Sequence, residues 1–236
     1  MKIPVMLSQK RAATCSICTK GSCALSTLSQ EEILKMEMHT HQSDIPQAEM
    51  LMRQHTPVHS IIYLRSGYLK EFVAHENRPN QVVQILREGT YIGLPALFGS
   101  KTCNFSYKAL SDIEVCFIEK NTFQSLVHSN IRFSNEILHS MSSDTLRNQL
   151  RILALTQKQS FGKVADTLLY LARQVYESRS FDMQLTRTEL AQMIASTREN
   201  VTKTLRRLMN EGIIFLKGSY IKILQMEQLE EIAKNG

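Results

Sequence analysis

Three cysteines lie close together near the start of this 236-residue chain: Cys15, Cys18 and Cys23, in the stretch "TCSICTKGSC". Thiolates at such spacing can pair as disulfides, bind zinc, hold an iron–sulfur cluster or have no function. The first residues are too polar for a secretory signal, so we expect a cytoplasmic protein. In a reducing cytosol, clustered cysteines bind metal or do redox chemistry more often than they form disulfides, and five cysteines cannot all pair.

The composition excludes some classes of protein and leaves others open. Apolar residues make up 43% of the chain, enough for a globular core, and no run reaches the ~20 apolar residues of a membrane span. The net charge of +6 is compatible with a polyanionic partner. No nucleophile–base pair or glycine-rich phosphate loop stands out, so we expect no enzyme; a cysteine-based redox or metal protein is the alternative from that class.

The elements that must position these cysteines begin with a short helix and a strand-rich region. Ser29 is placed to cap the helix. Between about 45 and 119, short apolar runs such as "HSIIYL", "QVVQIL" and "IEVCFI" alternate with turn signals, and four of the chain's nine glycines lie there. Many short strands with regular turns predict a sandwich or a jelly-roll-like barrel.

A helical pattern follows the strands. From about Thr122, some thirty residues contain no Gly or Pro, and apolar residues recur at steps of three and four, which predicts one long helix. Its apolar face is wide enough to serve both its own domain and a partner helix, whereas the alternative is a helix that packs only on its own domain. We predict a homodimer with these interface residues: Leu138, Met141, Leu146, Leu150 and Leu153.

The last third of the chain has helix-turn-helix spacing. Thr188 is placed to cap a first helix, "AST" at 195–197 forms a turn, and a second helix runs from Arg198 until Gly212 closes it. Gly218 and Ser219 then separate two strand-like runs, which predicts the hairpin wing of a winged helix. Seven Lys or Arg residues stand against three Glu between 187 and 222, so most of the net charge is here.

The second of these helices has the residue types of a base reader. Arg can bond guanine bidentately and Glu can accept from cytosine, and Arg198, Glu199 and Lys203 lie within about one turn of each other. The alternative is a charged face that contacts protein. We predict DNA contacts from the following residues: Arg187, Thr188, Thr197, Arg198, Glu199, Asn200, Thr202, Lys203, Arg206, Arg207, Lys217 and Ser219.

The segments "GKVADTLLYLARQ" and "LTRTELAQMIASTRENVTKTLRRLMNEGII" resemble the carboxy-terminal half of the CRP/FNR superfamily of bacterial transcription regulators. "IIYLRSGYLKEF", "LREGTYIGLPALF" and "IEVCFIEKNTFQSL" resemble the cyclic-nucleotide-binding-like roll of that family. The resemblance implies an α+β fold: a cysteine segment (1–28), a sensory roll (29–121), a dimerisation helix (122–157) and a winged helix-turn-helix domain (158–236). It also implies a regulator that binds promoter DNA and acts with RNA polymerase.

Members of the family that bind cyclic AMP carry a Gly-Glu pair for the ribose and an Arg-Ser pair for the phosphate. Here the first place reads Gly93-Leu94-Pro95, and the second falls near Cys103-Asn104. The carboxylate and the guanidinium that would hold the nucleotide are both missing. We therefore expect no cyclic AMP in this effector pocket, while another small ligand stays open.

The oxygen-sensing FNR branch of the family suggests a role for the cysteines. That branch keeps three cluster ligands just before the roll, where Cys15, Cys18 and Cys23 stand, and a fourth on a late strand, which matches Cys116 here. The resemblance implies a [4Fe–4S] cluster that senses oxygen, redox state or nitric oxide, with Cys103 as a spare thiol. The spacing between the second and third cysteines is one residue shorter than in the best-known branch. Zinc, no ligand at all, or heme bound through a histidine are the alternatives.

Overall fold

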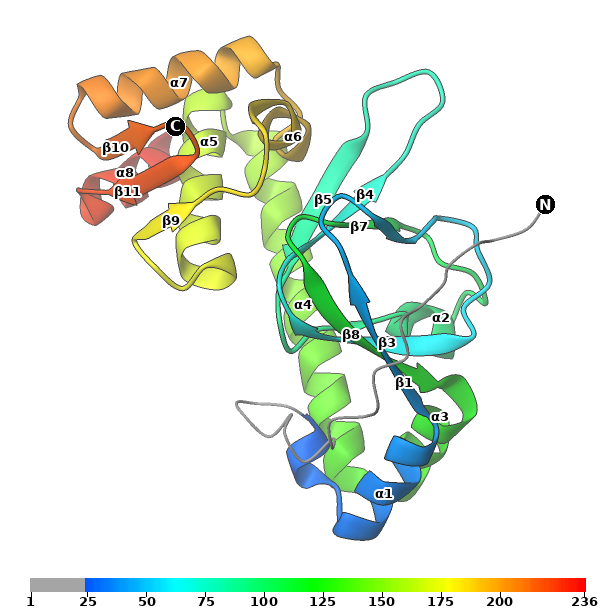
Figure 1. Ribbon diagram of the computed structural model, residues 1–236. Helices are drawn as coiled ribbons and strands as arrows, with labels where there is room; N and C mark the ends of the chain where they lie inside the picture. The colour runs from blue at the N-terminus through cyan, green and yellow to red at the C-terminus, as the bar shows by residue number, and fades with distance from the viewer. Residues whose placement is uncertain (1–23) are drawn as a thin grey trace. The chain divides into compact units, whose positions relative to one another are not determined.

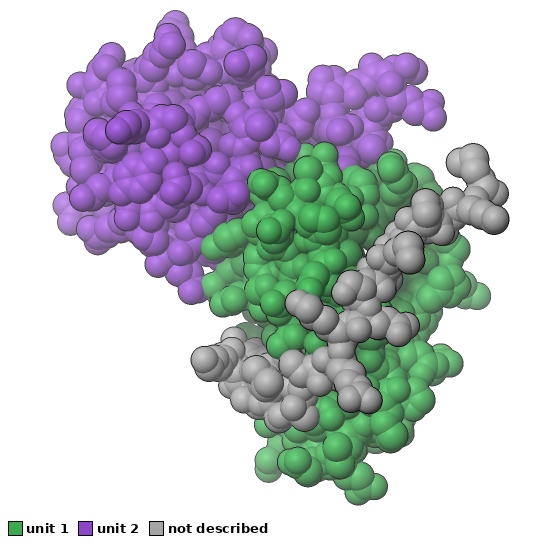
Figure 2. Space-filling view, in the orientation of Figure 1, with its two compact units in different colours: residues 1–71, 86–144 green, residues 72–85, 145–236 purple. Residues whose placement is uncertain are grey.

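Two compact units make up the chain in the computed structural model, which describes residues 24–236 (Figure 1). Of the described residues, unit 1 contains 24–71 and 86–144, and unit 2 contains 72–85 and 145–236 (Figure 2). Cys15, Cys18 and Cys23 lie outside the described residues. Within those residues, no helix is both long enough and apolar enough to cross a membrane.

Within residues 24–236, eight strands form the roll. They are β1 (Thr40–Ile45), β2 (Met50–Met52), β3 (Ser60–Ser66), β4 (Leu69–Val73), β5 (Gln81–Leu86), β6 (Tyr91–Ile92), β7 (Ser106–Ala109) and β8 (Ile113–Glu119). One sheet has the order β1-β8-β3-β6 and the other β2-β7-β4-β5. This arrangement confirms the predicted jelly-roll fold, and β4 and β5 continue into unit 2 as a hairpin.

Strands β3 and β8 are buried on both faces, which explains why their sequences are almost continuously apolar. Ile62 and Val115 point into the core between the two sheets, where β4, β5 and β7 supply the opposite wall. Their neighbours Ile61 and Cys116 point the other way, into a second apolar cluster formed with helices. Because side chains alternate along a strand, one short run supplies both cores.

Helices cover the outer side of the β1-β8-β3-β6 sheet. The cluster there takes buried side chains from η2 (Ala24–Thr27), α1 (Gln30–Met38), α2 (Leu94–Phe98), α3 (Lys120–Ser129) and α4 (Ile131–Gln157). As predicted, Ser29 caps α1: its side chain accepts from the Glu32 amide, and the Glu32 carboxylate accepts from the Ser29 amide. This reciprocal pair is a capping box.

The single helix predicted from about Thr122 is wrong in one respect, because the chain breaks at Asn130 into α3 and α4. Asn130 has an extended backbone, with φ −114° and ψ 103°, and its side-chain oxygen accepts a hydrogen bond from the Phe133 amide at 3.0 Å. Its amide nitrogen donates to Glu32 at 2.9 Å. Asn at such a position satisfies the free amides of a new helix, so the lack of Gly or Pro did not guarantee continuity.

Unit 2 contains the winged helix. Its elements are α5 (Ser160–Tyr170), a π-helical turn (Leu171–Val175), β9 (Ser180–Asp182), α6 (Arg187–Met193), α7 (Arg198–Asn210), β10 (Ile214–Lys217), β11 (Tyr220–Ile223) and α8 (Met226–Asn235). Lys217 pairs with Tyr220, so Gly218 and Ser219 form the predicted two-residue turn of the wing. Buried Leu190, Ile194, Val201, Leu205 and Leu208 hold α6 and α7 in the same core.

The N-terminal cap of α6 is Thr186, and the prediction that Thr188 caps it is wrong. The Thr186 hydroxyl accepts from the Glu189 amide at 3.2 Å, and the Glu189 carboxylate accepts from the Thr186 amide at 2.9 Å. Both threonines are compatible with a capping role, but only Thr186 has Glu three positions later, which completes a capping box.

Candidate DNA interface and cysteine site

The polar face of α7 is exposed along its length, while its apolar face is buried. Val201, Leu205 and Leu208 are at most 1% exposed. The exposed residues on the other side are Arg198, Glu199, Asn200, Lys203, Arg206 and Arg207. Because buried and exposed residues alternate with the period of a helix, α7 has one face packed in the core and one exposed, cation-rich face.

This surface forms one wall of a groove of about 1160 Å³, and the start of α5 forms the other. Six cations and two carboxylates line the groove. The wall from α5 comprises Lys158, Gln159, Ser160, Phe161 and Lys163, none of which the sequence prediction included. Two lysines flanking a helix start, in "QKQSFGK", are the signal that could have indicated them.

Arg207 is held against the two helices that form the groove. Its guanidinium carbon lies 4.0 Å from the centre of the Phe161 ring, and its Nε donates to Glu211 at 2.7 Å. A cation over an aromatic face is attracted by the ring quadrupole. Arg207 therefore connects α7 to α5, although its side chain, like that of Arg206, is exposed.

Some of the remaining predicted DNA contacts hydrogen-bond within their own helix, and others are exposed to solvent. Thr197 caps α7 by accepting from the Asn200 amide at 3.2 Å, and the Thr202 hydroxyl donates to the Arg198 carbonyl at 2.8 Å. Thr188 and Lys217 are exposed. The hydroxyls of Thr197 and Thr202 are thus engaged in hydrogen bonds to the backbone of α7.

Arg187, at the start of α6, contacts the turn of the wing. Its Nη2 donates to the Gly218 carbonyl at 2.9 Å, while its Nη1 is buried and finds no hydrogen-bond partner among residues 24–236. Burial lowers the pKa of this guanidinium below its usual range. On the same turn, the Ser219 hydroxyl donates to the Asp182 carboxylate at 3.4 Å. Arg187 therefore fixes the wing relative to α6.

The two described cysteines lie on opposite sides of the β1-β8-β3-β6 sheet, Cys116 within strand β8 and Cys103 in the loop before β7. Cys116, on β8, is 3% exposed and belongs to the helix-side cluster, which also contains Ala24 and Leu25. Cys103 is 4% exposed and belongs to the core between the sheets, where its thiol donates to the Phe105 carbonyl at 3.0 Å. Burial raises the pKa of the Cys103 thiol, and the nearby Glu71 carboxylate adds to the rise.

Residues 24–236 contain no group of three or more His, Cys, Asp or Glu side chains arranged to hold a metal ion. The other three predicted ligands lie outside this range.

The residues predicted for the effector pocket do not converge. Gly93, with φ +97°, precedes α2, and Pro95 lies in the first turn of that helix. Leu94 is buried in the helix-side cluster, whereas Cys103 is buried between the sheets. Asn104 is exposed and bonds Ser100 at 3.3 Å. Leu94 and Cys103 are thus packed into two different apolar clusters, while Asn104 lies on the surface.

Four of the five leucine and methionine residues predicted for the dimer interface are exposed on α4. Leu138, Leu146 and Leu150 are 57–58% exposed and Leu153 is 49% exposed. Met141 instead packs against the helix-side cluster. An isolated apolar residue on a surface is ordinary, but a row of leucines along one helix face indicates a site of contact with another surface.

Known proteins resemble the chain over both units. The cyclic nucleotide-binding domain matches residues 43–130, and the Crp-like helix-turn-helix domain matches residues 162–232. The Electron transport regulator A of Shewanella oneidensis is 25% identical over 95% of this chain and 92% of its own length. The Fumarate and nitrate reduction regulatory protein of Vibrio cholerae is 25% identical over 97% of both chains.

Solved structures share the fold. FixK2 from Bradyrhizobium japonicum covers 82% of this chain and 96% of its own, with a TM-score of 0.74 at 17% identity. A CRP/FNR family regulator from Thermus thermophilus covers 83% and 99%, with a TM-score of 0.68 at 20% identity. With a cyclic-nucleotide-binding-type roll, a long helix and a Crp-like helix-turn-helix domain in this order, the chain belongs to the CRP/FNR superfamily of transcription regulators.

Proposed function

We propose that the protein is a homodimeric, sequence-specific DNA-binding regulator that senses oxygen, redox state or nitric oxide through a [4Fe–4S] cluster. Cys15, Cys18, Cys23 and Cys116 are the proposed ligands. The observation that carries the DNA-binding half is the exposed, cation-rich face of α7, which lines a groove beside the start of α5. RNA polymerase and a promoter remain its predicted partners.

In the proposed complex, α7 enters the major groove of DNA. Side chains near the N-terminus of a recognition helix reach base edges, so Arg198, Glu199 and Lys203 are the proposed base readers. Lys158 and Lys163, on the other wall of the groove, are placed to contact the phosphate backbone. Contacts to phosphates add affinity without sequence preference, whereas Glu199 would distinguish cytosine.

A second copy of the chain is the proposed cover for the leucines of α4. Burying an apolar side chain stabilises an interface by roughly 1.5–3 kcal/mol, and Leu146, Leu150 and Leu153 would contribute from both copies. A two-fold dimer also presents two recognition helices to half-sites ~34 Å apart. One helix face thus supports both association and DNA geometry.

The position of Cys116 supports it as the fourth ligand in preference to Cys103. Ala24 directly follows Cys23 in the sequence, and Ala24 and Leu25 share an apolar cluster with Cys116. Cys103 is buried on the opposite face of the β1-β8-β3-β6 sheet. A thiolate at Cys116 suits an iron–sulfur centre, which when bound supplies a group that oxygen or nitric oxide can alter.

The apolar cluster around Cys116 also contains residues of the dimer helix α4, so it could couple the two. Phe133 and Ile137 of α4 are at most 2% exposed within it, and Phe133 contacts Phe123 edge to face at 5.4 Å between ring centres. A change of ligation at Cys116 would therefore alter packing beneath the start of α4. The name Anaerobic regulatory protein, carried by a relative from Pasteurella multocida that is 24% identical, supports a signal of this kind.

Anaerobic purification of the wild type, Cys116→Ser and Cys103→Ser proteins tests the proposal. Visible absorbance, iron and sulfide content and operator binding are measured on each. We expect about four irons per protomer and a broad absorbance in the wild type and in Cys103→Ser, and loss of both in Cys116→Ser.

A wild type that binds no iron contradicts the cluster while leaving DNA binding open. Loss of the absorbance in Cys103→Ser but not in Cys116→Ser would show that the fourth ligand is misassigned. Circular dichroism of both variants separates loss of ligand from loss of fold.

A further inference from the structure

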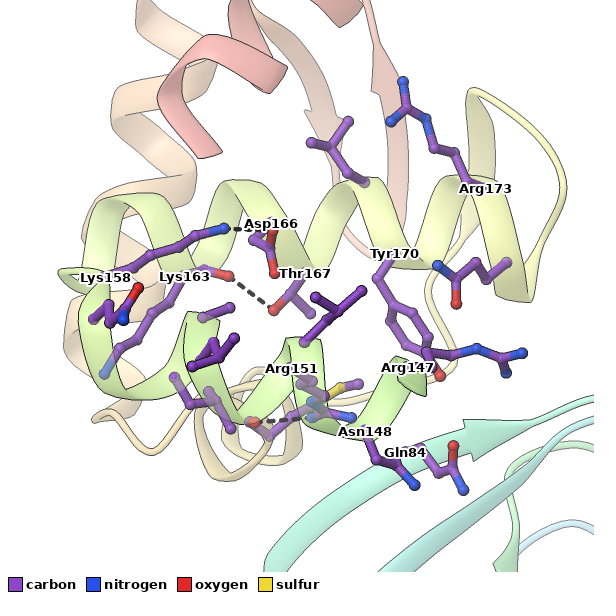
Figure 3. Close-up of a pocket in the computed structure, with 18 residues that line it drawn as sticks. Gln84, Arg147, Asn148, Arg151, Lys158, Lys163, Asp166, Thr167, Tyr170 and Arg173 are labelled. Carbon is purple, nitrogen blue, oxygen red and sulfur yellow. Dashed lines mark hydrogen bonds and ion pairs between the residues drawn. The ribbon is translucent and has the colours of Figure 1, made fainter. Parts of the chain in front are cut away.

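A cavity of about 430 Å³ lies between the C-terminal half of α4 and α5, entirely within unit 2 (Figure 3). We call it the α4–α5 cavity. Gln84 of β5 and Met193 of α6 complete its lining. The volume lies within the ~300–1000 Å³ typical of small-molecule sites. The proposed function assigns Leu150 and Leu153 to the dimer interface and Lys158 and Lys163 to DNA, but it assigns no ligand to the cavity itself.

The lining is strongly positive. Five cations, Arg147, Arg151, Lys158, Lys163 and Arg173, face one carboxylate, Asp166, for a formal charge of +4. The carboxylate is already paired, because Asp166 accepts from the Lys158 ammonium at 2.7 Å. Arg173 pairs with Glu230, which lies outside the lining. An anionic ligand would therefore meet attraction from several directions.

The aromatic wall of the cavity is held in place. The Tyr170 hydroxyl donates to the Ile85 carbonyl at 3.1 Å and lies 3.2 Å from the Ile85 amide, which donates back to it. Arg151 lies over the Tyr170 ring, 5.8 Å from its centre, and donates to the carbonyls of Met193, at 3.0 Å, and Val83. A fixed ring beside Leu155 and Leu169 offers a preformed surface for a flat or apolar group.

Two lysines belong to both the α4–α5 cavity and the DNA groove. Lys158 and Lys163 line each of them, and Figure 3 shows both at the end of the cavity where α5 begins. The ammonium of either lysine has a reach of a few ångströms, so a phosphate in the cavity would compete with a DNA phosphate for it. Occupancy of one site should then weaken the other, reciprocally.

We propose that the α4–α5 cavity binds a small phosphorylated molecule with an aromatic or apolar part, of about mononucleotide size, and that this ligand opposes DNA binding. This small-molecule site would be additional to the cluster proposed at Cys116, and it lies outside the roll. Within the roll, Leu94 and Cys103 are packed into apolar cores. Only the antagonism rests on the proposed function, since ligand binding can be measured without DNA.

Calorimetry of the full-length protein with ADP, at 0.15 M salt, tests the site. Inorganic pyrophosphate serves as the probe of the anionic part alone. Arg147 lines the cavity but not the DNA groove, and Arg206 lines the groove but not the cavity. We expect Arg147→Gln to weaken ADP binding about tenfold, because a charge-assisted hydrogen bond is lost, and Arg206→Gln to leave it unchanged.

An exposed residue of the same unit controls for net charge. Arg179→Gln removes one positive charge from a position that lines neither site, and it should leave ADP binding unchanged. Pyrophosphate should bind more weakly than ADP, because it makes no contact with the Tyr170 ring or the leucines. Sedimentation of each variant establishes that the oligomeric state is the same.

Operator binding without ADP and with ADP at about ten times its wild-type Kd tests the antagonism. We expect ADP to weaken wild-type affinity about fivefold, and to weaken that of Arg147→Gln less, because the variant is only about half occupied at this concentration. Loss of ADP binding in Arg206→Gln rather than in Arg147→Gln would place ADP in the DNA groove, and equal loss in both would indicate attraction by charge alone. Either result would overturn the proposal. So would the lack of any ADP binding below ~1 mM, the expected result if a partner helix fills the cavity. A protein that binds ADP through Arg147 but binds no DNA would instead contradict the proposed function.

Discussion

The winged helix and the roll carry their proposed sites in different ways. In the winged helix, the residues proposed to contact DNA fall between Lys158 and Ser219, on exposed or half-buried positions of neighbouring elements. In the roll, the proposed fourth ligand, Cys116, stands 93 positions after Cys23 and is buried. A site built on one helix face can be recognised from local spacing, whereas a site that joins distant segments depends on the complete fold.

The two units also differ in what their apolar residues reveal. In α7, one face is buried and one is free, so the periodicity separates core from function. In β8, both faces are buried, so Cys116 looks like any other residue of an apolar strand. The four predictions below test this contrast, from the largest expected effect to the smallest.

The α4 helix belongs to both units, and removal of its apolar face should have the largest effect. The double substitution Leu146→Glu with Leu150→Glu should give a monomer, because charges would replace leucines in the proposed interface. Operator affinity should fall by at least ~100-fold, since the two half-sites are no longer bound together. Analytical ultracentrifugation and operator titration measure both effects.

Ile152→Glu is the matched control on the same helix. Ile152 is 60% exposed and, at 100° per residue, lies roughly 120° from Leu146 and 160° from Leu150 around the helix, nearer to Leu138 at the edge of the leucine row. It should weaken the dimer and DNA affinity much less than the double substitution does. A dimer that survives the double substitution would mean that another surface joins the copies.

Gly67, in the turn between β3 and β4, should be essential for the stability of the roll. It has φ +85°, and a Cβ atom there would lie 2.4 Å from the Asp112 carbonyl oxygen. Gly67→Ala should therefore lower the free energy of unfolding by at least ~2 kcal/mol, measured by urea denaturation.

Gly89 separates backbone strain from the steric clash. It has φ +88°, but a Cβ atom there would meet nothing within 4 Å, so Gly89→Ala should cost only ~1 kcal/mol. If both substitutions lower the free energy of unfolding equally, the close contact between Gly67 and the Asp112 carbonyl oxygen is not the cause of the loss at Gly67.

Glu199 and Arg206 should differ in what they contribute to DNA binding. Glu199→Ala should cost ~1–3 kcal/mol on the cognate operator and relax the preference at one base pair. Arg206→Ala should weaken cognate and scrambled DNA similarly and reduce the salt dependence, as expected for a phosphate contact. Equal losses for Glu199→Ala on both DNAs would exclude it from base reading.

The smallest effect concerns the start of α6. Thr186→Ala removes the side chain that accepts from the Glu189 amide and should lower the free energy of unfolding by ~1 kcal/mol. Thr188→Ala, at an exposed position inside the first turn, should change it by less than ~0.5 kcal/mol. Thermal denaturation of the pair decides between the two caps.

Much of the fold could be predicted from local patterns. Alternating strands, the Ser29 cap, the Gly218-Ser219 turn and the helix-turn-helix spacing each depend on residues a few positions apart. The break at Asn130 could not be predicted in this way. It depends on Asn130 bonding Glu32, almost a hundred positions earlier, and on the packing of Phe123 against Phe133.

By itself, the sequence determined the order of roll, helix and winged helix, and the polar face of α7, because hydrophobic periodicity and turn residues act over short distances. Only the tertiary structure decided that Lys158 and Lys163 share a groove with α7 and also line the α4–α5 cavity. It also decided that Cys116 and Cys103 lie on opposite faces of one sheet. These placements follow from packing between segments that are distant in the sequence, and local sequence patterns do not determine which distant segments will contact each other.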